Sequence, residues 1–514
     1  MKAAGDAHVA PHRRRLIAER ATSFGAFALG ALAVLGYAPF SLFFLPLLTL
    51  AALLVLWQQS STAREAARVG FGYGLGFFLC GVSWVYVSLH DFGAMPAPLA
   101  ALATLLFCAF LALFPAAAGY LHARAPLGSP LKLALFFPAI WTLLEWTRGW
   151  IFSGFPWLAL GYSQIPGSAL AGYAPVLGIY GVTLAAAMTS ALLAFLWLRY
   201  RRKERIAGAA AAVVLTLWLA GWGLKQVEWT HPAGETVSVS LLQGNVPQDM
   251  KFRADRIQRT LEDYRALAES SASRLIILPE TALPLFLDNV PEGYLAELAE
   301  HARRNGGDML IGVPERHADG RYYNSVITVG SAPRQRYHKY HLVPFGEFIP
   351  LRPVLGGIVG ALAIPLQDFT RGTAAPRPLQ VGGQRVAVNI CYEDAFGEEI
   401  IRQLPEATML VNVSNVAWFG RSIAPQQHLQ ISQARALETG RYMLRATNTG
   451  VTAVIDRHGE VVKSAPEFSR AVLTHEVPGF QGATPYVRWG NYAVLALCVA
   501  LVALTAAFAR RASS

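Results

Sequence analysis

The sequence is short of charge and of cysteine, and each shortage narrows what the protein can be. Only 15% of its 514 residues are charged while 54% are hydrophobic, which is lean in charge for a soluble protein. Three of the four cysteines, Cys80, Cys108 and Cys498, lie in long apolar runs, so no disulfide framework is indicated. The sequence also lacks a glycine-rich phosphate loop after a strand and any His/Cys/Asp spacing typical of zinc. We therefore predict no cofactor and no metal.

Charge is divided unevenly along the chain. The segment 227–486 contains 25 basic and 27 acidic residues, a net charge of −2. The rest of the chain contains 19 basic and 6 acidic residues, a net charge of +13. A nucleic-acid-binding protein would need a basic patch on its folded polar part, and this distribution indicates none. No nucleic-acid partner is expected.

Eight apolar segments can be placed as membrane spans, which need roughly 20 apolar residues each. We predict seven transmembrane helices with short loops in residues 1–225, a polar domain in residues 226–487 and a C-terminal transmembrane helix in residues 488–514. The first two spans are short and could form a hairpin. The predicted cores are 23–38, 42–57, 69–89, 98–120, 131–146, 176–198, 206–224 and 491–509.

Basic residues beside the spans predict their orientation, because Lys and Arg resist translocation. With strictly alternating spans, 16 of the 19 basic residues outside the polar domain fall on one side, which should be cytoplasmic. The polar domain would then face the periplasm of a bacterial inner membrane. The loop 148–173, rich in aromatics, Gly and Pro, suits either an aromatic belt or a lipid-facing floor under that domain, and Glu145 and Arg148 are expected to pair with each other.

The polar domain alternates apolar strands with helices, which is typical of sheets covered on both faces. We predict a layered α/β domain with two sheets back to back and helices outside. An apolar arm in the linker 351–378 either dips into lipid or packs on the domain. Strands are expected at 236–244, 275–278, 309–313, 324–330, 336–343, 386–390, 409–413, 452–456 and 471–476, and helices at 254–272, 292–304 and 426–439.

Three reactive side chains each follow a predicted strand: Glu280, Lys339 and Cys391. A lone cysteine is by default a buried structural residue. Here, however, a carboxylate can take the thiol proton, and an ammonium can stabilise both the thiolate and an oxyanion. The backbone N–H of Tyr392 can supply a second oxyanion donor. These residue types predict attack on an ester or amide and a thioester on Cys391.

Three motifs carry a family resemblance: residues 278–281 around Glu280, residues 337–347 around Lys339, and Cys391-Tyr392-Glu393. In this order they resemble the Glu-Lys-Cys triad of the nitrilase, or carbon–nitrogen hydrolase, superfamily. With the membrane spans, the chain resembles the apolipoprotein N-acyltransferase family. That resemblance implies an α-β-β-α sandwich, with Glu280 as base, Lys339 as oxyanion partner and Cys391 as nucleophile. Glu347, Tyr392 and Glu393 match its supporting residues.

The resemblance also implies the substrates. The acyl donor would be a phospholipid, usually phosphatidylethanolamine, and the acceptor would be the N-terminal amine of diacylglyceryl-cysteine in an apolipoprotein. Residues 243–248 match the opening motif of the family, although Phe252 stands where a tryptophan is common. His338 and His341 are interpreted as hydrogen-bonding neighbours of Lys339.

Two other functions remain open from the residues. A membrane-tethered amidase or nitrilase would use the same triad with water as acceptor, but would not need eight spans. A transporter would need polar residues inside its spans, and few are present.

Overall fold

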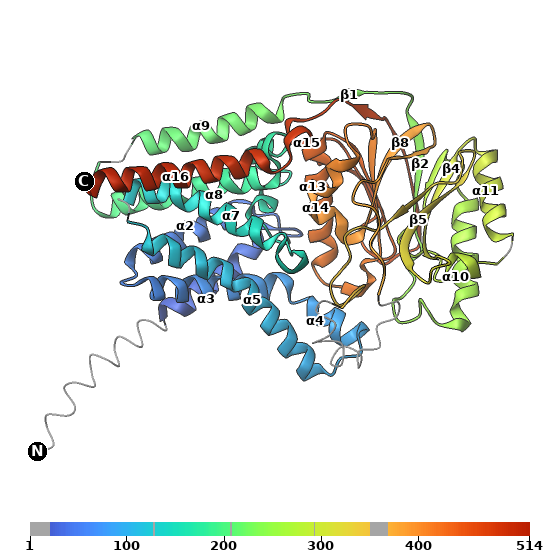
Figure 1. Ribbon diagram of the computed structural model, residues 1–514, viewed down its shortest axis with the longest axis horizontal. Helices are drawn as coiled ribbons and strands as arrows, with labels where there is room; N and C mark the ends of the chain where they lie inside the picture. Colours follow the sequence, from blue (N-terminus) through green and yellow to red (C-terminus); the bar gives the residue numbers. More distant parts are fainter. Residues whose placement is uncertain (1–20, 127–128, 206–207, 292, 350–367, 514) are drawn as a thin grey trace, which may run out of the picture.

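The computed structural model describes residues 21–513, except 127–128, 206–207, 292 and 350–367. Two parts are evident: a body of long helices, and an α/β part with two sheets (Figure 1). The apolar centre predicted for the 351–378 linker lies outside the described residues.

The helical body comes from both ends of the chain. After a helix at Ala21–Gly36, its elements are α2 (Phe44–Gln59), α3 (Ala63–Val82), α4 (Val85–Val87), α5 (Ala97–Arg124), α6 (Ser129–Leu131), α7 (Phe137–Arg148), α8 (Ala174–Arg201), α9 (Gly208–Lys225) and α16 (Tyr492–Ser513).

Several of these helices can cross a membrane. Among the described residues four are long and apolar enough, namely α5, α8 with the turn before it, α9 and α16. Helix α3 and the helical segment Val85–Phe92, bent by 55°, can form a fifth span together, while Ala21–Gly36 and α2 are shorter apolar helices. The predicted span 131–146 is interrupted by a π-helical turn at Lys132–Phe136, so α7 is short. The predicted count of eight spans is therefore not confirmed, although each predicted segment contains helix.

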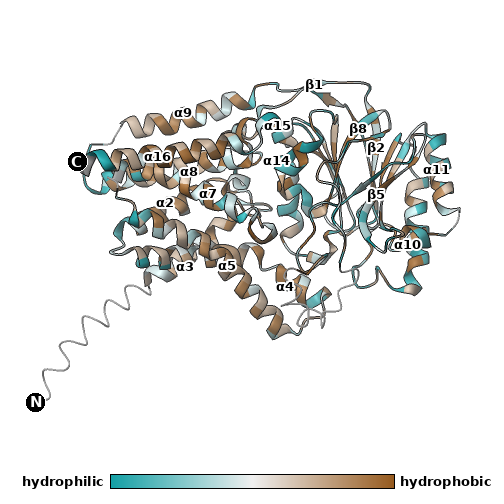
Figure 2. Cartoon of the chain, in the orientation of Figure 1, coloured by the Kyte–Doolittle hydropathy of each residue, from teal (hydrophilic) through white to brown (hydrophobic). Residues whose placement is uncertain are grey.

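The helices of the helical body are predominantly apolar, as their mostly brown ribbons in Figure 2 show. Large side chains on α5, α9 and α16 are exposed, such as Leu106, Leu219, Trp222 and Val499. Exposed large apolar side chains on several helices fit contact with lipid.

The α/β part contains two six-stranded sheets, in the orders β12-β11-β10-β9-β8-β7 and β13-β2-β3-β4-β5-β6. Their inner faces share one apolar core, to which Val239, Ile277, Val388 and Val411 contribute. The first sheet consists of β7 (Leu379–Val381), β8 (Gln384–Ile390), β9 (Met409–Ser414), β10 (Met443–Thr447), β11 (Ala453–Ile455) and β12 (Val461–Ser464). The second consists of β2 (Val237–Gln243), β3 (Leu275–Ile277), β4 (Asp308–Arg316), β5 (Tyr322–Gly330), β6 (Arg336–His338) and β13 (Ala471–Val477).

Helices cover the outer face of each sheet, which completes the predicted sandwich of two sheets between helices. On the second sheet lie α10 (Ala254–Glu269) and α11 (Tyr294–Arg304), whose apolar faces pack on it through Leu261 and Leu298. On the first sheet lie α13 (Gly397–Ile400) and α14 (Ala424–Thr439), between the sheet and the membrane helices (Figure 1). A two-stranded ribbon, β1 (His231–Pro232) with β14 (Phe480–Gln481), and α15 (Pro485–Trp489) link this part to α16.

Most predicted strands of the α/β part are confirmed, with two informative differences. The strand predicted at 336–343 ends at His338, so Lys339 leaves the sheet directly at its edge. Strand β10 was missed because Arg445 and Thr447 make it polar in sequence, although all five of its residues are buried.

Helix α14 connects the nucleophile sheet to the membrane helices. Of its 16 residues only Gln426 and Gln433 are not buried. Gln427 Oε1 accepts hydrogen bonds from the indole N–H groups of Trp84 (3.1 Å) and Trp157 (2.8 Å), and its Nε2 donates to the Gly81 carbonyl (3.0 Å). The helix therefore lies at the interface between the two parts, and its polar side chains form hydrogen bonds across that interface (the polar seam).

The loop after α7 packs under the α/β part. Residues 156–165 are buried, whereas Trp150 and Phe152 are exposed. Glu145 accepts from the Leu160 N–H (3.0 Å), and Arg148 donates to the carbonyls of Phe155 and Trp157 (2.6 and 2.7 Å). The predicted pairing of Glu145 with Arg148 is not confirmed as a direct ion pair, because both side chains make their hydrogen bonds to the loop. The loop is a floor beneath the α/β part, and most of it is covered rather than facing lipid.

Candidate active site

Glu280 follows β3, beyond the carboxyl end of that strand, and its carboxylate accepts hydrogen bonds from two donors beside Lys339. Oε1 accepts from Asn324 Nδ2 (2.8 Å) and lies 3.5 Å from Lys339 Nζ, while Oε2 accepts from the backbone N–H of Asn415 (2.8 Å). Donors of this kind favour the ionised carboxylate and fix its orientation.

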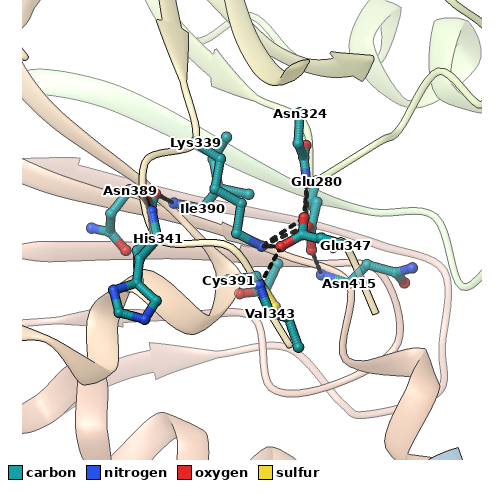
Figure 3. Close-up of polar contacts among 12 residues, drawn as sticks. Glu280, Asn324, Lys339, His341, Val343, Glu347, Asn389, Ile390, Cys391 and Asn415 are labelled. Atoms are coloured by element: carbon teal, nitrogen blue, oxygen red, sulfur yellow. Dashed lines mark hydrogen bonds and ion pairs between the residues drawn. The ribbon is translucent and has the colours of Figure 1, made fainter. Parts of the chain in front are cut away.

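Lys339 and Glu347 form a buried ion pair beside Glu280 (Figure 3). Lys339 is 1% exposed, and its Nζ lies 3.0 and 2.9 Å from the two oxygens of Glu347. Asn324 Nδ2 donates to Glu347 Oε1 (2.9 Å) as well as to Glu280, so one amide group holds both carboxylates. Glu347 also accepts from the Val343 N–H (2.8 Å), which closes the loop that carries it.

Cys391 stands at the turn where β8 ends and a 3-10 helix (Cys391–Ala395) begins. Its φ of 55° lies in the left-handed region, which is uncommon for a residue with a side chain and is often associated with function. Its carbonyl accepts a hydrogen bond from Asn412 Nδ2 (3.1 Å) and contacts His428 Nε2 (3.2 Å). Side chains of β9 and α14 therefore stabilise the strained turn. The side chain is half-buried, close to the Glu280–Lys339–Glu347 group (Figure 3).

The electrostatics of these groups favour an uncharged thiol beside an ionised carboxylate. Burial raises the pKa of the Cys391 thiol, and the negative charge of Glu280 raises it further against the effect of Lys339. Burial alone would raise the pKa of Glu280, but Lys339, Lys251 and the hydrogen bonds from Asn324 and Asn415 lower it on balance. Burial opposes the charge of Lys339, yet Glu347 and Glu280 raise its pKa. At neutral pH the thiol is therefore protonated, with an ionised carboxylate nearby to accept its proton.

Glu393 connects the turn that carries Cys391 (the nucleophile turn) to the loop that carries Lys339 (the lysine loop). Its carboxylate accepts from four donors: the N–H groups of Ile390 (2.7 Å), Tyr340 (2.7 Å) and His341 (3.0 Å), and the Tyr337 hydroxyl (2.9 Å). Burial raises the pKa of Glu393 to about 7, although Lys339 and the backbone donors act against the rise. This carboxylate fixes the positions of Cys391 and Lys339 relative to each other.

Tyr392 points away from the catalytic group, toward the membrane part. Its hydroxyl donates to the Gly154 carbonyl (2.9 Å), and its ring stacks near Trp157 with centroids 6.4 Å apart. The nucleophile turn is thus anchored on the floor loop by the residue that follows the cysteine.

A buried polar network under Cys391 was not found from the sequence. Asp394 accepts from Ser432 Oγ (2.5 Å) and Arg445 Nη1 (3.2 Å), and it lies 2.7 Å from His428 Nε2. Arg445 also donates to Asn412 Oδ1 (2.8 Å), which links the network to the nucleophile carbonyl. Asp394 directly follows the Cys391-Tyr392-Glu393 motif. That position was the only sequence feature from which a role for Asp394 could have been predicted.

Sequence reasoning also missed Asn324 and Lys251. Lys251 is 2% exposed, and its Nζ donates to the Glu280 carbonyl (3.2 Å). Burial lowers the pKa of Lys251 to about 8, while Glu280 and Cys391 act in the opposite direction. The one available signal was that Lys251 lies three residues after the 243–248 motif. The site therefore holds two ammonium groups and two carboxylates, Glu280 and Glu347.

The two histidines beside Lys339 lie apart from the reacting groups. His341 lies 2.8 Å from the Ser153 carbonyl and 3.2 Å from Glu399, and His338 lies 2.9 Å from Ser325 Oγ. Both make hydrogen-bonding contacts of the predicted kind.

Comparisons with known proteins cover both parts of the chain. Residues 29–192 match the apolipoprotein N-acyltransferase N-terminal domain, and residues 238–486 match the carbon-nitrogen hydrolase family. A protein of Nitrosomonas europaea named apolipoprotein N-acyltransferase is 55% identical over 92% of this chain and 94% of its own length. A protein of the same name from Methylococcus capsulatus is 49% identical over 94% of this chain and 96% of its own. Among solved structures, an amidase from Nesterenkonia sp. matches with 17% identity and a TM-score of 0.37, over 52% of this chain and 97% of that one.

Proposed function

The chain belongs to the apolipoprotein N-acyltransferase family, and from this we propose that it transfers an acyl chain from a phospholipid to the N-terminal amine of a diacylated apolipoprotein. The observation that carries the proposal at the level of chemistry is the convergence of Glu280, Lys339 and Cys391 beside one another. Their roles are base, oxyanion partner and nucleophile.

In the first step the enzyme takes the acyl group. Glu280 accepts the thiol proton while Cys391 Sγ attacks the ester carbonyl carbon, and the carbonyl oxygen becomes negative. Lys339 Nζ and the Tyr392 N–H stabilise this oxygen, each such donor contributing about 3–4 kcal/mol. The carbon–oxygen bond then breaks, the alkoxide of the lysophospholipid takes the proton from Glu280, and a thioester remains on Cys391.

In the second step the acyl group passes to nitrogen. The acceptor amine attacks the thioester carbon and Glu280 takes a proton from the amine nitrogen. The carbon–sulfur bond breaks, the thiolate takes the proton back from Glu280, and an amide is the product. Glu280 is thus regenerated in its ionised form after each half-reaction.

Three other residues act by positioning. Glu347 holds Lys339, Asn324 holds both carboxylates, and Glu393 fixes the lysine loop to the nucleophile turn. Because catalysis by positioned groups is sensitive to displacements of about 1 Å, these contacts matter even though they need not touch substrate.

We further propose eight spans, divided as residues 1–225 and 488–514, around a catalytic domain at 226–487 that faces the periplasm of the bacterial inner membrane. Support comes from the basic residues in the last turn of α16, Arg510 and Arg511, because that helix ends far from the two sheets (Figure 1). The link between α8 and α9, which carries the 199–205 basic cluster, lies at the same end of the helical body (Figure 1). Phosphatidylethanolamine is the proposed donor.

The test uses the full-length protein in detergent with phosphatidylethanolamine vesicles. Intact-mass measurement should find one acyl adduct, which a diacylated lipopeptide then removes as a triacylated product. The adduct should be missing in Cys391→Ala and retained in Cys80→Ala, a matched change at an exposed cysteine of the membrane part. Release of the acyl chain as free fatty acid, with the lipopeptide unchanged, would favour the amidase with water as acceptor.

A further inference from the structure

Three potential metal ligands converge outside the catalytic group, on the second sheet. Glu315 lies near the end of β4, His317 follows that strand, and His338 ends β6, with β5 between them. One ligand atom from each lies within 4.8 Å of the other two. The ring of Tyr323 on β5 packs against both imidazoles, with centroids 4.8 and 4.4 Å apart.

Two of the three groups carry a buried atom that has no protein partner. Glu315 is 5% exposed, and its Oε1 accepts from Arg336 Nη1 (2.5 Å). Within the described part of the chain, Glu315 Oε2 and His317 Nε2 are both buried without a hydrogen-bond partner. Leaving such atoms unsatisfied costs about 1–3 kcal/mol each, so a group that binds both would be stabilising.

We propose that Glu315, His317 and His338 bind a zinc ion. Two imidazoles and one carboxylate form a ligand set that zinc accepts, with bonds of about 2.0–2.2 Å. Tetrahedral ligands at that bond length lie about 3.4 Å apart. His338 Nδ1 lies 3.8 Å from Glu315 Oε2, and His317 Nε2 lies 4.0 Å from Glu315 Oε1. The three ligand atoms, which lie within 4.8 Å of one another, must approach by up to about 1.4 Å, and water supplies the fourth ligand.

Two neighbours adapt to the ion. Arg336 keeps its contact with Glu315 Oε1 and leaves Oε2 for the metal. Ser325 Oγ, now 2.9 Å from His338 Nδ1, must rotate about its Cα–Cβ bond away from that nitrogen to make room for the ion. No zinc spacing is evident in the sequence, because Glu315 and His338 are brought together only by the pairing of β4, β5 and β6.

The site would act on catalysis indirectly. His338 directly precedes Lys339, so an ion between β4 and β6 fixes the strand end from which the catalytic lysine projects. The ion takes no part in the acyl transfer itself, and its binding can be measured without any activity.

The test is zinc binding by the full-length protein in detergent, after removal of metal with a chelator. Titration with Zn²⁺ should give one ion per chain, and Co²⁺ in its place should give the visible absorption of a tetrahedral site. His317→Ala and His338→Ala should each weaken binding by more than about 100-fold, since even indirect neighbours of a metal cost about 10–100-fold. His475→Ala, on β13 at the other edge of the same sheet, should bind as wild type.

These measurements distinguish a site that binds zinc from a cluster held together only by the Arg336–Glu315 ion pair. Failure of the wild-type protein to bind Zn²⁺, or equal binding by wild type and His317→Ala, overturns the proposal. His317 is partly exposed, so His317→Ala should fold, and its melting temperature without metal should equal that of wild type. Added Zn²⁺ should then raise the melting temperature of wild type only.

Discussion

Replacing Glu280 with glutamine tests the proposed base and its hydrogen bonds together. Both carboxylate oxygens face donors, from Asn324 Nδ2 and the Asn415 N–H at 2.8 Å each, with Lys339 Nζ at 3.5 Å. A glutamine keeps one oxygen and must turn its NH₂ group toward one of these donors. The variant therefore loses the proton acceptor and also gains one unfavourable buried contact.

The expected magnitudes differ for rate and stability. Loss of a general base slows its step by about 10²–10⁴-fold, which is about 2.7–5.4 kcal/mol of activation free energy. The unfavourable contact should lower the free energy of unfolding by about 1–3 kcal/mol. Because the pKa of Glu280 is lowered in the folded protein, its ionised form stabilises the fold above the ordinary value of about 4.3 and this stabilisation is lost as pH falls. The glutamine variant should lack that part of the acid sensitivity.

The assay is the rate of acyl-enzyme formation, followed by intact mass in single turnover, beside thermal unfolding from pH 4 to pH 8. Cys391→Ala supplies the baseline without adduct, and Glu280→Asp keeps a carboxylate on a shorter side chain. A glutamine variant that acylates at the wild-type rate would refute the assignment of Glu280 as base.

Three further substitutions test other contacts. Lys251→Met should slow acylation at neutral pH by about tenfold or more, because tenfold is the effect of one unit charge about 12 Å away at an effective dielectric constant near 20 and a nearer charge acts more strongly. Because the pKa of Lys251 is about 8, the wild-type rate should fall toward that of the variant as pH rises above 8. Parallel pH–rate profiles would contradict this prediction. Tyr337→Phe removes one of four donors to Glu393 and should lower the free energy of unfolding by about 1.5–3 kcal/mol, measured by chemical denaturation, with the acyl-enzyme still formed. Gln427→Leu leaves the Trp157 indole N–H unpaired and removes one of the two acceptors of the Trp84 indole N–H, which keeps the Gly81 carbonyl. It should lower the melting temperature by more than Gln433→Ala, whose side chain donates to the Gly459 carbonyl within the α/β part. Equal melting temperatures would argue against a contribution of Gln427 to the contact between the two parts.

The sequence predicted the sheets well because buried strands are apolar throughout and end at clear turns. Glu280, Lys339 and Cys391 were identifiable because each follows such a strand, where a side chain emerges at the rim of the sheet. Strand β10 was missed because the buried Arg445 pairs through Nη1 with Asp394 and Asn412, and these partners come together only in the folded domain.

The remaining misses have the same physical origin, since they depend on contacts between distant segments. In the sequence Asn324 is an ordinary strand residue. Only in the folded domain does β5 place its amide between Glu280 and Glu347. Helix α14 reads as a surface helix, because nothing local shows that its polar side chains meet membrane helices. The number of spans could not be read from apolar length alone, since bends and π-turns such as Lys132–Phe136 divide apolar runs.

The buried polar face of α14 has a consequence for recombining members of the family. A chimera could join the membrane helices of one relative to the hydrolase-like part of another. Its interface would be mismatched unless Gln427, Trp84 and Trp157 all came from the same parent. Glu438, which accepts from the Ile179 N–H (2.7 Å), extends the same dependence to α8. The two halves are thus inherited as a matched pair, and a water-soluble version of the catalyst would need that whole helix face redesigned.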